Sequence, residues 1–391
     1  MTQTDQQNVP KLRFPGFRGE WETSTVERLA KVTTGSRDTK NRKKDGEFPF
    51  FVRSDNVEKI DTWALNCEAV VTSGDGVGVG KNFHYINGKF DFHQRVYAIY
   101  DFAKSLDGFF FFQFFKERFY QRVMRLSAKN SVDSVRMSMI TDMPITLPTL
   151  SEQRKIAGFL GVVDTKVAQL AKKRRLLEEY KKGCMQQLFS EKIRFKDKNG
   201  NAFPDWEEKR LGDVVNIYDG THQTPKYVSE GVPFYSVEHV TSNNFQSTKF
   251  ISEDVFASEN KRVRIEEGDI LLTRIGDIGT ARLINWDVRA SFYVSLALIK
   301  SSVSGVGGFL SQYMTHDDFQ RELWHRTIHV AFPKKINLGE IGNCKVKLPH
   351  PEEQRKIAGF LSALDRKIEL VAEELEQAKA FKKGLLQQMF V

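Results

Sequence analysis

One stretch of the chain, GDGVGVGKN at 74–82, resembles a phosphate-binding loop. The pattern GxxxxGK(S/T) would need Gly at 75 and Ser or Thr at 82, so that backbone N–H groups cradle phosphates and the hydroxyl binds Mg²⁺. The chain has Asp75 and Asn82 instead. No two prolines are adjacent, so the (D/N/S)PP(Y/F/W) motif of amino-methyltransferases is absent as well. We therefore expect neither kind of chemistry from this chain.

Two further sets have the residue types of metal-dependent hydrolases. Asp205, Glu207 and Lys209 have the composition of a nuclease Asp…Glu-x-Lys triad, but they are crowded into a segment that the chain repeats elsewhere. His325 and His329 lie four apart, but HRTIH lacks the Glu of the zinc-protease motif HExxH. A structural role for the first set and a pair on a helix surface for the second are favoured. The sequence predicts no catalytic residue and no metal site.

The elements that organise the chain are most visible in an internal repeat. Residues 147–189 and 348–390 align without a gap, 201 positions apart, and 20 of the 43 aligned residues are identical. A repeat of this length indicates two similar halves in tandem. The predicted segments are a globule at 1–146, a helix at 147–190, a second globule at 191–347 and a second helix at 348–391.

Both repeats have the apolar spacing of a long helix that pairs with another helix. From Ile156 to Leu188, and from Ile357 to Met389, the seam positions alternate in steps of four and three, the a/d pattern of a coiled coil. Arg174 and Lys181 in the first seam and Lys382 in the second are the polar positions. About 40 residues at 1.5 Å each give a rod of roughly 60 Å. A core helix inside a globular fold is the alternative.

The order globule, helix, globule, helix predicts that the two helices pair with each other and run antiparallel. Helix 1 carries the basic run 172–175, and helix 2 carries Glu373, Glu374 and Glu376 in the matching region. Opposite charge favours pairing between the helices over pairing of each with its own copy. The expected fold class is α+β, with two similar globules separated by two long antiparallel coiled-coil helices in a pseudo-two-fold repeat.

The globules keep landmarks in the same order, although they diverge more than the helices. Trp21-Glu22 corresponds to Trp206-Glu207, and short β-rich runs follow later in each globule. The aromatic run 109–119 is expected to be a core helix and not a base-stacking platform. Each globule is predicted to be α+β with a small twisted sheet.

The composition favours a nucleic-acid partner in a reducing compartment. The 391 residues include 59 Lys and Arg against 50 Asp and Glu, a formal net charge of +9. Three scattered cysteines exclude a disulfide framework. The N-terminus lacks the apolar core of a signal peptide, and the most apolar run, 109–115, is too short to cross a bilayer. We expect a cytoplasmic protein without membrane contact.

The globules differ most in two polar loops, SRDTKNRKKDGE at 36–47 and DGTHQTPKYVSEG at 219–231. Both are rich in side chains that hydrogen-bond to bases and phosphates. A solvated loop without a ligand is the alternative for any single residue. Because the two globules share landmarks but have different polar loops, we interpret them as two recognition domains built on the same fold.

The openings of the two repeats, LPTLSEQRKIAGFL and LPHPEEQRKIAGFL, resemble the signature of the conserved helices in specificity (S) subunits of type I restriction–modification systems. The repeat order, the chain length and the TPKY…VPFYSV pattern match that family as well, so the resemblance covers essentially the whole chain. In that family each globule is a target recognition domain that reads one half of a split DNA sequence. The two helices form an antiparallel spacer and dock two methyltransferase subunits, and restriction subunits add to that core.

The resemblance implies that this chain supplies specificity, and that its partners are double-stranded DNA with a bipartite site, two methyltransferase subunits and restriction subunits. It implies no cofactor in this chain, because S-adenosylmethionine, ATP and Mg are expected in partner subunits. Loop side chains able to contact phosphates or base edges are the DNA-binding candidates: Arg37, Lys40, Arg42, Lys43, Arg53, Asn56, Thr221, His222, Gln223, Lys226, Glu238, His239, Arg274 and Lys335. Residues expected to be exposed at the start of the repeats are the partner-binding candidates: Gln153, Arg154, Lys155, Gln354, Arg355 and Lys356.

Two other function classes stay open at this point, a coiled-coil scaffold that does not bind DNA and a stand-alone DNA-modifying enzyme. The basic charge and the two different loops argue against the first, and the missing methyltransferase motifs argue against the second. A gel shift with random duplex at low salt tests the first class, and S-adenosylmethionine binding by the purified chain tests the second. The target sequence, the spacer length and the exact base contacts are not determined by the sequence.

Overall fold

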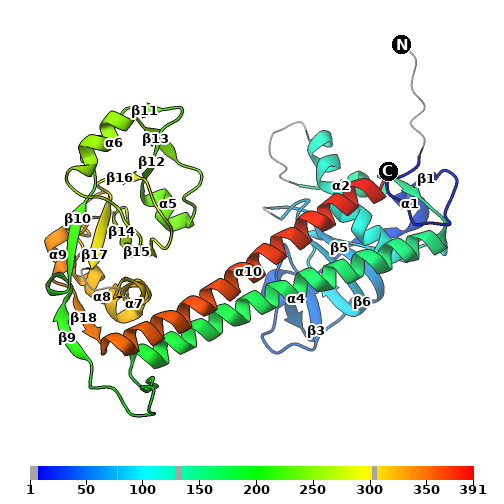
Figure 1. The fold of residues 1–391 in the computed structure, drawn as a ribbon. Coiled ribbons are helices and arrows are strands. Elements are labelled where there is room, and N and C mark those ends of the chain that lie inside the picture. The colour runs from blue at the N-terminus through cyan, green and yellow to red at the C-terminus, as the bar shows by residue number, and fades with distance from the viewer. Residues whose placement is uncertain (1–7, 77, 128–133, 302–305) are drawn as a thin grey trace. The chain divides into compact units, whose positions relative to one another are not determined.

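The computed structural model describes residues 8–76, 78–127, 134–301 and 306–391 and divides into two compact units. Unit 1 comprises Met1–Lys172 with Ala372–Val391, and unit 2 comprises Lys173–Val371. The division falls inside the two longest helices, α4 (Leu150–Phe189) and α10 (Pro351–Met389). Each unit therefore contains one globule and half of each long helix (Figure 1).

Unit 1 is built on a six-stranded sheet of order β2-β7-β5-β6-β3-β4. Neighbouring strands are antiparallel except β3 and β6, which are parallel, and a separate ribbon pairs β1 with β8. The central strand β5 is buried on both faces over its second half, Ala69–Ser73, where three apolar residues are followed by Thr72 and Ser73. The strands are β1 (Glu22–Thr25), β2 (Lys31–Thr34), β3 (Phe48–Phe51), β4 (Glu58–Ile60), β5 (Leu65–Ser73), β6 (Phe83–Phe92), β7 (Val96–Tyr100) and β8 (Pro144–Leu147).

Helix α2 (Gly108–Leu126) packs its aromatic residues against this sheet. Asp107 caps the helix, since its Oδ1 accepts a hydrogen bond from the N–H of Phe110 at 2.9 Å. Phe115 lies edge-on to Phe83 of β6, with ring centroids 5.6 Å apart, and both belong to the main core of the unit. The prediction of a core helix over 109–119 is confirmed. The remaining short helices are α1 (Val26–Leu29), η1 (Thr39–Asn41) and α3 (Met137–Thr141).

Unit 2 has two four-stranded sheets, of order β10-β17-β14-β15 and β11-β13-β12-β16, and a ribbon of β18 and β9. The orders match unit 1 if the single long strand β6 corresponds to both β15 and β16, apart from the additional edge strand β11. One sheet of unit 1 is therefore two sheets in unit 2. The strands are β9 (Glu207–Arg210), β10 (Val215–Asp219), β11 (Tyr227–Val228), β12 (Val232–Tyr235), β13 (Lys249–Ile251), β14 (Ile270–Ile275), β15 (Asp277–Leu283), β16 (Ser291–Phe292), β17 (Leu296–Ser301) and β18 (Lys345–Leu348).

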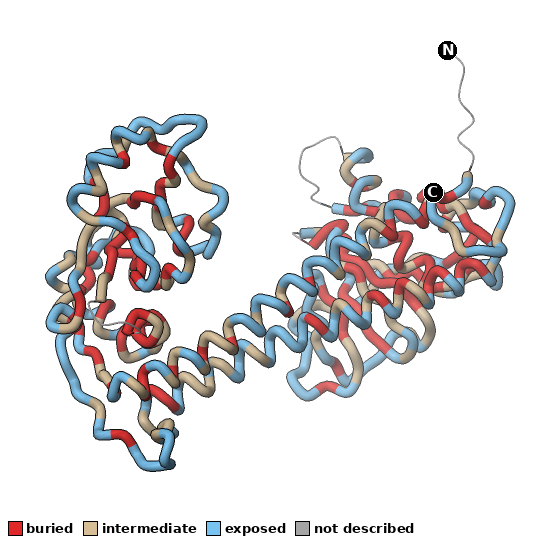
Figure 2. The backbone as a smooth tube through the Cα atoms, in the orientation of Figure 1, coloured by how far each residue is buried: buried red, intermediate tan, exposed pale blue. Residues whose placement is uncertain are grey.

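The core of unit 2 joins its first sheet to halves of the long helices. Phe189 of α4 and Leu361 of α10 are fully buried against Phe309 and Leu310. Figure 2 shows each long helix buried along one side and exposed along the other. The helices of the globule are η2 (Leu211–Asp213), α5 (Val237–Ser242), α6 (Glu253–Asn260), α7 (Val306–Tyr313), α8 (Asp317–Arg326) and α9 (Leu338–Gly342).

In each unit α4 and α10 run antiparallel and meet through an ion pair. Asp164, early in α4, lies 2.5 Å from the Nζ of Lys382, late in α10. In unit 2 the order is reversed, and Asp365, early in α10, lies 2.6 Å from the Nζ of Lys181, late in α4. The predicted antiparallel pairing is confirmed. Both helices begin three residues after the predicted segment boundaries, 147 and 348. The residues at those boundaries are instead the last residues of strands β8 and β18.

The basic run of α4 is paired differently from the expectation. Arg174 and Arg175 bond to Glu178 and Glu179 on their own helix, at 2.9 and 2.6 Å. Lys379 likewise bonds to Glu376 of its own helix at 2.8 Å. Residues four or three apart are neighbours on a helix surface, so local partners are within easiest reach.

Candidate nucleic-acid interface

The first candidate loop of unit 1 is anchored on Asp91 of β6. This carboxylate is 1% exposed and accepts hydrogen bonds from Arg37 Nε at 3.2 Å and from Thr62 Oγ1 at 2.8 Å. The Arg37 side chain nevertheless remains 40% exposed. The bond from Nε to Asp91 orients the guanidinium, and its two terminal nitrogens can then donate to a phosphate.

Three further candidates lie together on and after the turn η1. Lys40, Arg42 and Lys43 are exposed, and the latter two pair with the carboxylates of Glu58 and Asp61 at 3.2 and 2.5 Å. Exposed pairs of this kind are worth ~0–1 kcal/mol, so a phosphate can replace the carboxylate at little cost. Lys40 has no ion-pair partner among the residues that the structure describes. This turn therefore presents three positively charged side chains to solvent.

Arg53 and Asn56 lie in the connection between β3 and β4. Arg53 Nη1 is 3.4 Å from Asp75 Oδ1, and its side chain is half exposed. Asn82 donates to the carbonyl of Arg53 at 3.1 Å. The stretch that resembles a phosphate loop therefore holds the backbone of this connection. Asn56 is exposed.

In unit 2 the candidate loop begins at Asp219, which binds the side chains of His222 and Arg262. His222 Nε2 lies 2.5 Å from Asp219 Oδ2, and Arg262 bonds to both the carboxylate and the carbonyl of the same residue. Burial alone would raise the pKa of Asp219, but the hydrogen bonds from Arg262 and His222 outweigh it and hold the pKa below its usual value. The Asp219 carboxylate is thus ionised and positions the His222 imidazole and the Arg262 guanidinium.

Thr221 fixes the base of this loop, whereas the next candidates point into solvent. The Thr221 N–H donates to the carbonyl of Phe292, and its own carbonyl accepts from the N–H of Val294, both at 3.0 Å. Its side chain is 8% exposed. Gln223 and Lys226 are exposed. Hydrogen bonds therefore hold the backbone at the start of the loop, whereas the side chains of Gln223 and Lys226 are free to contact a ligand.

Glu238 and His239 form part of the first turn of α5. His239 is 4% exposed, and its Nδ1 accepts a hydrogen bond from the N–H of Ser236 at 2.9 Å. This bond completes a capping box with Ser236, so the imidazole stabilises the helix start. Glu238 is exposed and accepts a hydrogen bond from Ser236 Oγ at 3.2 Å. Of this pair, the structure leaves Glu238 accessible.

Arg274 and Lys335 come from neighbouring segments of the first sheet. Arg274 is 9% exposed, and burial lowers the pKa of its guanidinium while Asp219 opposes that change. Its Nε has no hydrogen-bond partner within the described part of the chain. Lys335 is exposed, and its backbone pairs with Ile275 and Ile328. Asp219 and Arg274 lie near the C-terminal ends of β10 and β14, which are at the same end of the first sheet because both strands pair antiparallel with β17. The bridge between Ile275 and Lys335 lies at that same end.

The partner-binding candidates divide into buried amides and exposed cations. Gln153 is fully buried, donates to the carbonyls of Ser105 and Pro148 at 2.9 Å, and accepts from the N–H of Asp107. Gln354 is 5% exposed and donates to the carbonyl of Pro349 at 2.8 Å. Both amides tie the helix start to the chain that precedes it. The presence of Gln at this position in both repeats is thus explained by local structure.

The cations beside these amides face outward. Arg154, Lys155 and Arg355 are exposed, and Lys356 is half-buried, with Nζ 2.5 Å from the carbonyl of Lys196. Lys155 Nζ lies 5.5 Å from the centre of the Phe14 ring. These four are available for contact with another chain at their outer edges.

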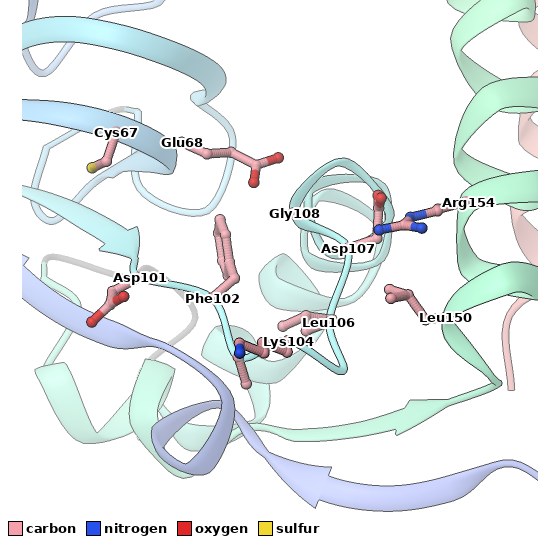
Figure 3. A pocket seen from close by; sticks show the side chains of 11 residues that line it. Cys67, Glu68, Asp101, Phe102, Lys104, Leu106, Asp107, Gly108, Leu150 and Arg154 are labelled. Atoms are coloured by element: carbon pink, nitrogen blue, oxygen red, sulfur yellow. The ribbon is translucent and has the colours of Figure 1, made fainter.

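Arg154 also lines a hollow of about 430 Å³ in unit 1 (Figure 3). Its wall includes Glu68, Asp101, Lys104 and Asp107, so charges of both signs surround the space. Glu68 accepts a hydrogen bond from the hydroxyl of Tyr85 at 2.5 Å, which fixes one side of the wall. The described residues contain no group of three or more His, Cys, Asp or Glu side chains placed to hold a metal ion.

The long helices expose large apolar side chains that the sequence analysis did not single out. Tyr180 and Phe381 are 56% and 58% exposed and lie at equivalent positions of the two repeats, 201 residues apart. Val162, Leu176 and Leu370 are exposed by 47% or more. These residues could have been recognised from the sequence, because they are apolar but lie outside the a/d seam. A helix face exposed to solvent would carry polar residues at such positions.

The comparison with protein families decides what this scaffold is. The model of the type I restriction modification DNA specificity domain matches twice, over residues 18–179 and 204–380. The chain belongs to this family. The two matches correspond to the two halves that the internal repeat predicted. The prediction of a DNA specificity subunit, which is not itself an enzyme, is confirmed, and so is the predicted fold class.

Known specificity subunits match over most of the chain. The type I restriction enzyme MjaVIII specificity subunit of Methanocaldococcus jannaschii is 26% identical over 358 residues, which cover 88% of this chain and 82% of that protein. The crystal structure of the type I restriction–modification S subunit from M. genitalium has the same fold, with a TM-score of 0.71, 18% identity and coverage of 98% and 99% of the two chains. A chain from a structure of complex assembly and conformational transition of the type I system matches with a TM-score of 0.50, 18% identity and coverage of 97% and 99%. Among the described helices of this specificity subunit, none has the length and hydrophobicity needed to cross a membrane.

Proposed function

We propose that this specificity subunit reads a bipartite DNA target, one half with each globule, and carries methyltransferase subunits on its long helices. The observation that supports the division of the target is the repeated frame with different polar loops. The turn η1 of unit 1 presents Lys40 and Arg42, whereas the corresponding region of unit 2 presents His222 and Lys226. Lys and Arg side chains of this kind position a protein on phosphates, and polar side chains on the same loops read base edges.

Two methyltransferase subunits are proposed because the exposed helix faces are duplicated. Tyr180 lies in unit 2 and Phe381 in unit 1, at equivalent positions of the repeat. Aromatic side chains are the residue type most enriched at the centres of protein interfaces. Restriction subunits would join this assembly, which acts on DNA in the cytoplasm. S-adenosylmethionine, ATP and Mg would be bound by the partner subunits, and this chain would contribute no group to methyl transfer or strand cleavage.

The test is an exchange of one globule. Residues 15–145 are replaced by the equivalent segment of another specificity subunit, and methylated adenines are mapped across the genome of cells that express the methyltransferase subunit. We expect one half of the recognised sequence to change and the other half to remain. A change in both halves would refute the division of the target between the globules.

A second arm tests the division of labour between the subunits. The purified chain alone is assayed for S-adenosylmethionine binding and methyl transfer, with the assembled complex as the positive control. We expect activity from the complex and none from the chain alone. Methylation by the highly purified chain would contradict the proposal.

The exposed aromatic side chains are tested separately. Tyr180→Ser and Phe381→Ser should each weaken methyltransferase binding in gel filtration. Gln169→Ser, on α4 like Tyr180, is the control.

A further inference from the structure

A short loop of unit 2, residues 328–335, holds two apolar side chains almost entirely in solvent. Val330 is 97% exposed and Phe332 is 103% exposed. Trp324, on the preceding helix α8, is 62% exposed. Burying a Val or Phe side chain is worth ~1.5–3 kcal/mol. Single exposed apolar residues are ordinary, but three between positions 324 and 332 form a group that gains free energy from a partner.

The base of the loop is fixed, so the exposure is a feature of the fold. The N–H of Ile328 donates to the carbonyl of Lys335, and the N–H of Gly276 donates to the carbonyl of Lys334, both at 2.8 Å. Ile336, which follows the loop, is fully buried in the core of unit 2. The tip between these anchors is therefore held out from the sheet at a defined place.

The surroundings of the tip are cationic. Lys334 and Lys335 are exposed and have no ion-pair partner within the described ranges. The ring of His329 lies 4.7 Å from that of Trp324 and its Nε2 is 2.8 Å from the Trp324 carbonyl. Asp277, next to the turn that binds Lys334, has its carboxylate engaged by the hydroxyls of Thr273 and Thr280. Apolar side chains rimmed by cations favour a polyanion with an apolar interior, which describes stacked DNA.

The loop also adjoins the residues that we place on the DNA side of unit 2. The N–H of Ile336 donates to the carbonyl of Arg274 at 3.0 Å, and Arg274 is close enough to Asp219 for their charges to interact. Asp219 in turn holds His222. The apolar tip and the candidate loop 219–231 thus both start from the same end of the first sheet, where β10 and β14 finish.

We infer that loop 328–335 is an apolar wedge, in which Phe332 enters a base step of the half-site read by unit 2 while Lys334 and Lys335 contact phosphates. Apolar side chains inserted between base pairs unstack them at a cost of a few kcal/mol and bend the duplex. The inserted ring recovers part of that cost by stacking on the exposed base. This inference rests on the proposed reading of DNA by unit 2.

The experiment uses the full chain assembled with its methyltransferase subunits and duplexes of the methylated sequence found in cells. The adenine analogue 2-aminopurine, which fluoresces when unstacked, replaces in turn each adenine of the half-site read by unit 2. The adenine that is methylated is left out, because methyltransferases flip their target base out of the stack. For the natural chain we expect a rise in fluorescence at one base step. Phe332→Ala should lose that rise and weaken specific binding by about tenfold. Phe332→Leu, which keeps an apolar side chain, should retain most of both.

Controls separate this role from folding and from simple charge attraction. Because Phe332 is fully exposed, neither variant should lower the melting temperature. Lys334→Gln should weaken binding at all sequences and reduce its salt dependence, yet leave the fluorescence rise in place at saturating protein.

Four results would overturn the inference. Specific binding by the natural complex without a rise at any position, or a rise that Phe332→Ala retains, would remove the wedge and leave DNA recognition intact. Normal DNA binding by Phe332→Ala with loss of methyltransferase subunits would assign the tip to a protein partner. Absence of any sequence-specific binding by the natural complex would refute the proposed function itself, and the wedge with it.

Discussion

Lys382 of α10 donates to Asp164 of α4 at 2.5 Å, and the same carboxylate accepts from Gln113 of α2 at 2.7 Å. Three elements of unit 1 therefore meet at one Asp side chain. Unit 2 repeats the arrangement, with Lys181 and Gln312 donating to Asp365 at 2.6 and 2.8 Å. A polar residue in an apolar seam fixes register at some cost in stability. The repeated cluster thus sets how the long helices align within each unit.

The carboxylate at this junction should matter more than a surface carboxylate. Asp164→Ala leaves Lys382, whose side chain is 14% exposed, and Gln113 without their acceptor. We expect the free energy of unfolding of unit 1 to fall by ~1–3 kcal/mol. Glu179→Ala, which removes an exposed pair with Arg175, should cost less than ~0.5 kcal/mol. Denaturant unfolding measures both changes. Equal losses of unfolding free energy in the two variants would show that the Asp164–Lys382 pair contributes no more than an exposed pair.

Neutralising a loop cation should change salt dependence more than specificity. Lys40→Ala and Lys226→Ala should each weaken binding to all sequences and reduce the slope of log affinity against log salt by about one. Lys198→Ala, an exposed lysine outside the candidate loops, should leave the slope unchanged. Affinities measured at four salt concentrations test this. The same slope in all three variants would remove these loops from the interface.

The three cysteines should differ in reactivity. Cys344 is fully buried, and burial raises the pKa of its thiol to about 12, whereas Cys67 and Cys184 are half-buried. At pH 8 the thiolate, which is the reactive form, would be about one part in ten thousand at Cys344. A thiol reagent should therefore modify two cysteines of the native protein and the third after unfolding. Cys344→Ala should remove the slow class, and rapid modification of all three native thiols would contradict the burial.

Lengthening both helices by one heptad should widen the gap between the two half-sites. Seven residues inserted near Leu170, with seven matching residues near Val371, keep the seam in register and add about 10 Å at 1.5 Å per residue. That length corresponds to about three base pairs. Methylated sites are mapped after assembly with methyltransferase subunits has been verified. An active variant with an unchanged gap would show that the bound subunits, and not the helices, set the spacing.

The sequence by itself determined the features that depend on periodicity and repetition. The alternation of four and three along 147–189 specifies a long helix with one apolar side, and its copy 201 residues later specifies a second half. Such patterns are local, so they survive without knowledge of contacts. The core role of the aromatic run 109–119 followed from the same reasoning, because so much apolar surface must be buried.

Tertiary structure alone decided which polar residues are structural. Gln153 and Gln354 looked like exposed partner contacts, yet their amides bind the chain that enters each helix, and His239 caps α5. Lys181 and Lys382 looked like interruptions of a seam, yet they are its paired positions. No sequence pattern singled out Phe332, whose side chain the fold leaves fully exposed. A polar or apolar side chain acquires its role from partners distant in sequence, and those partners are fixed only when the chain has folded.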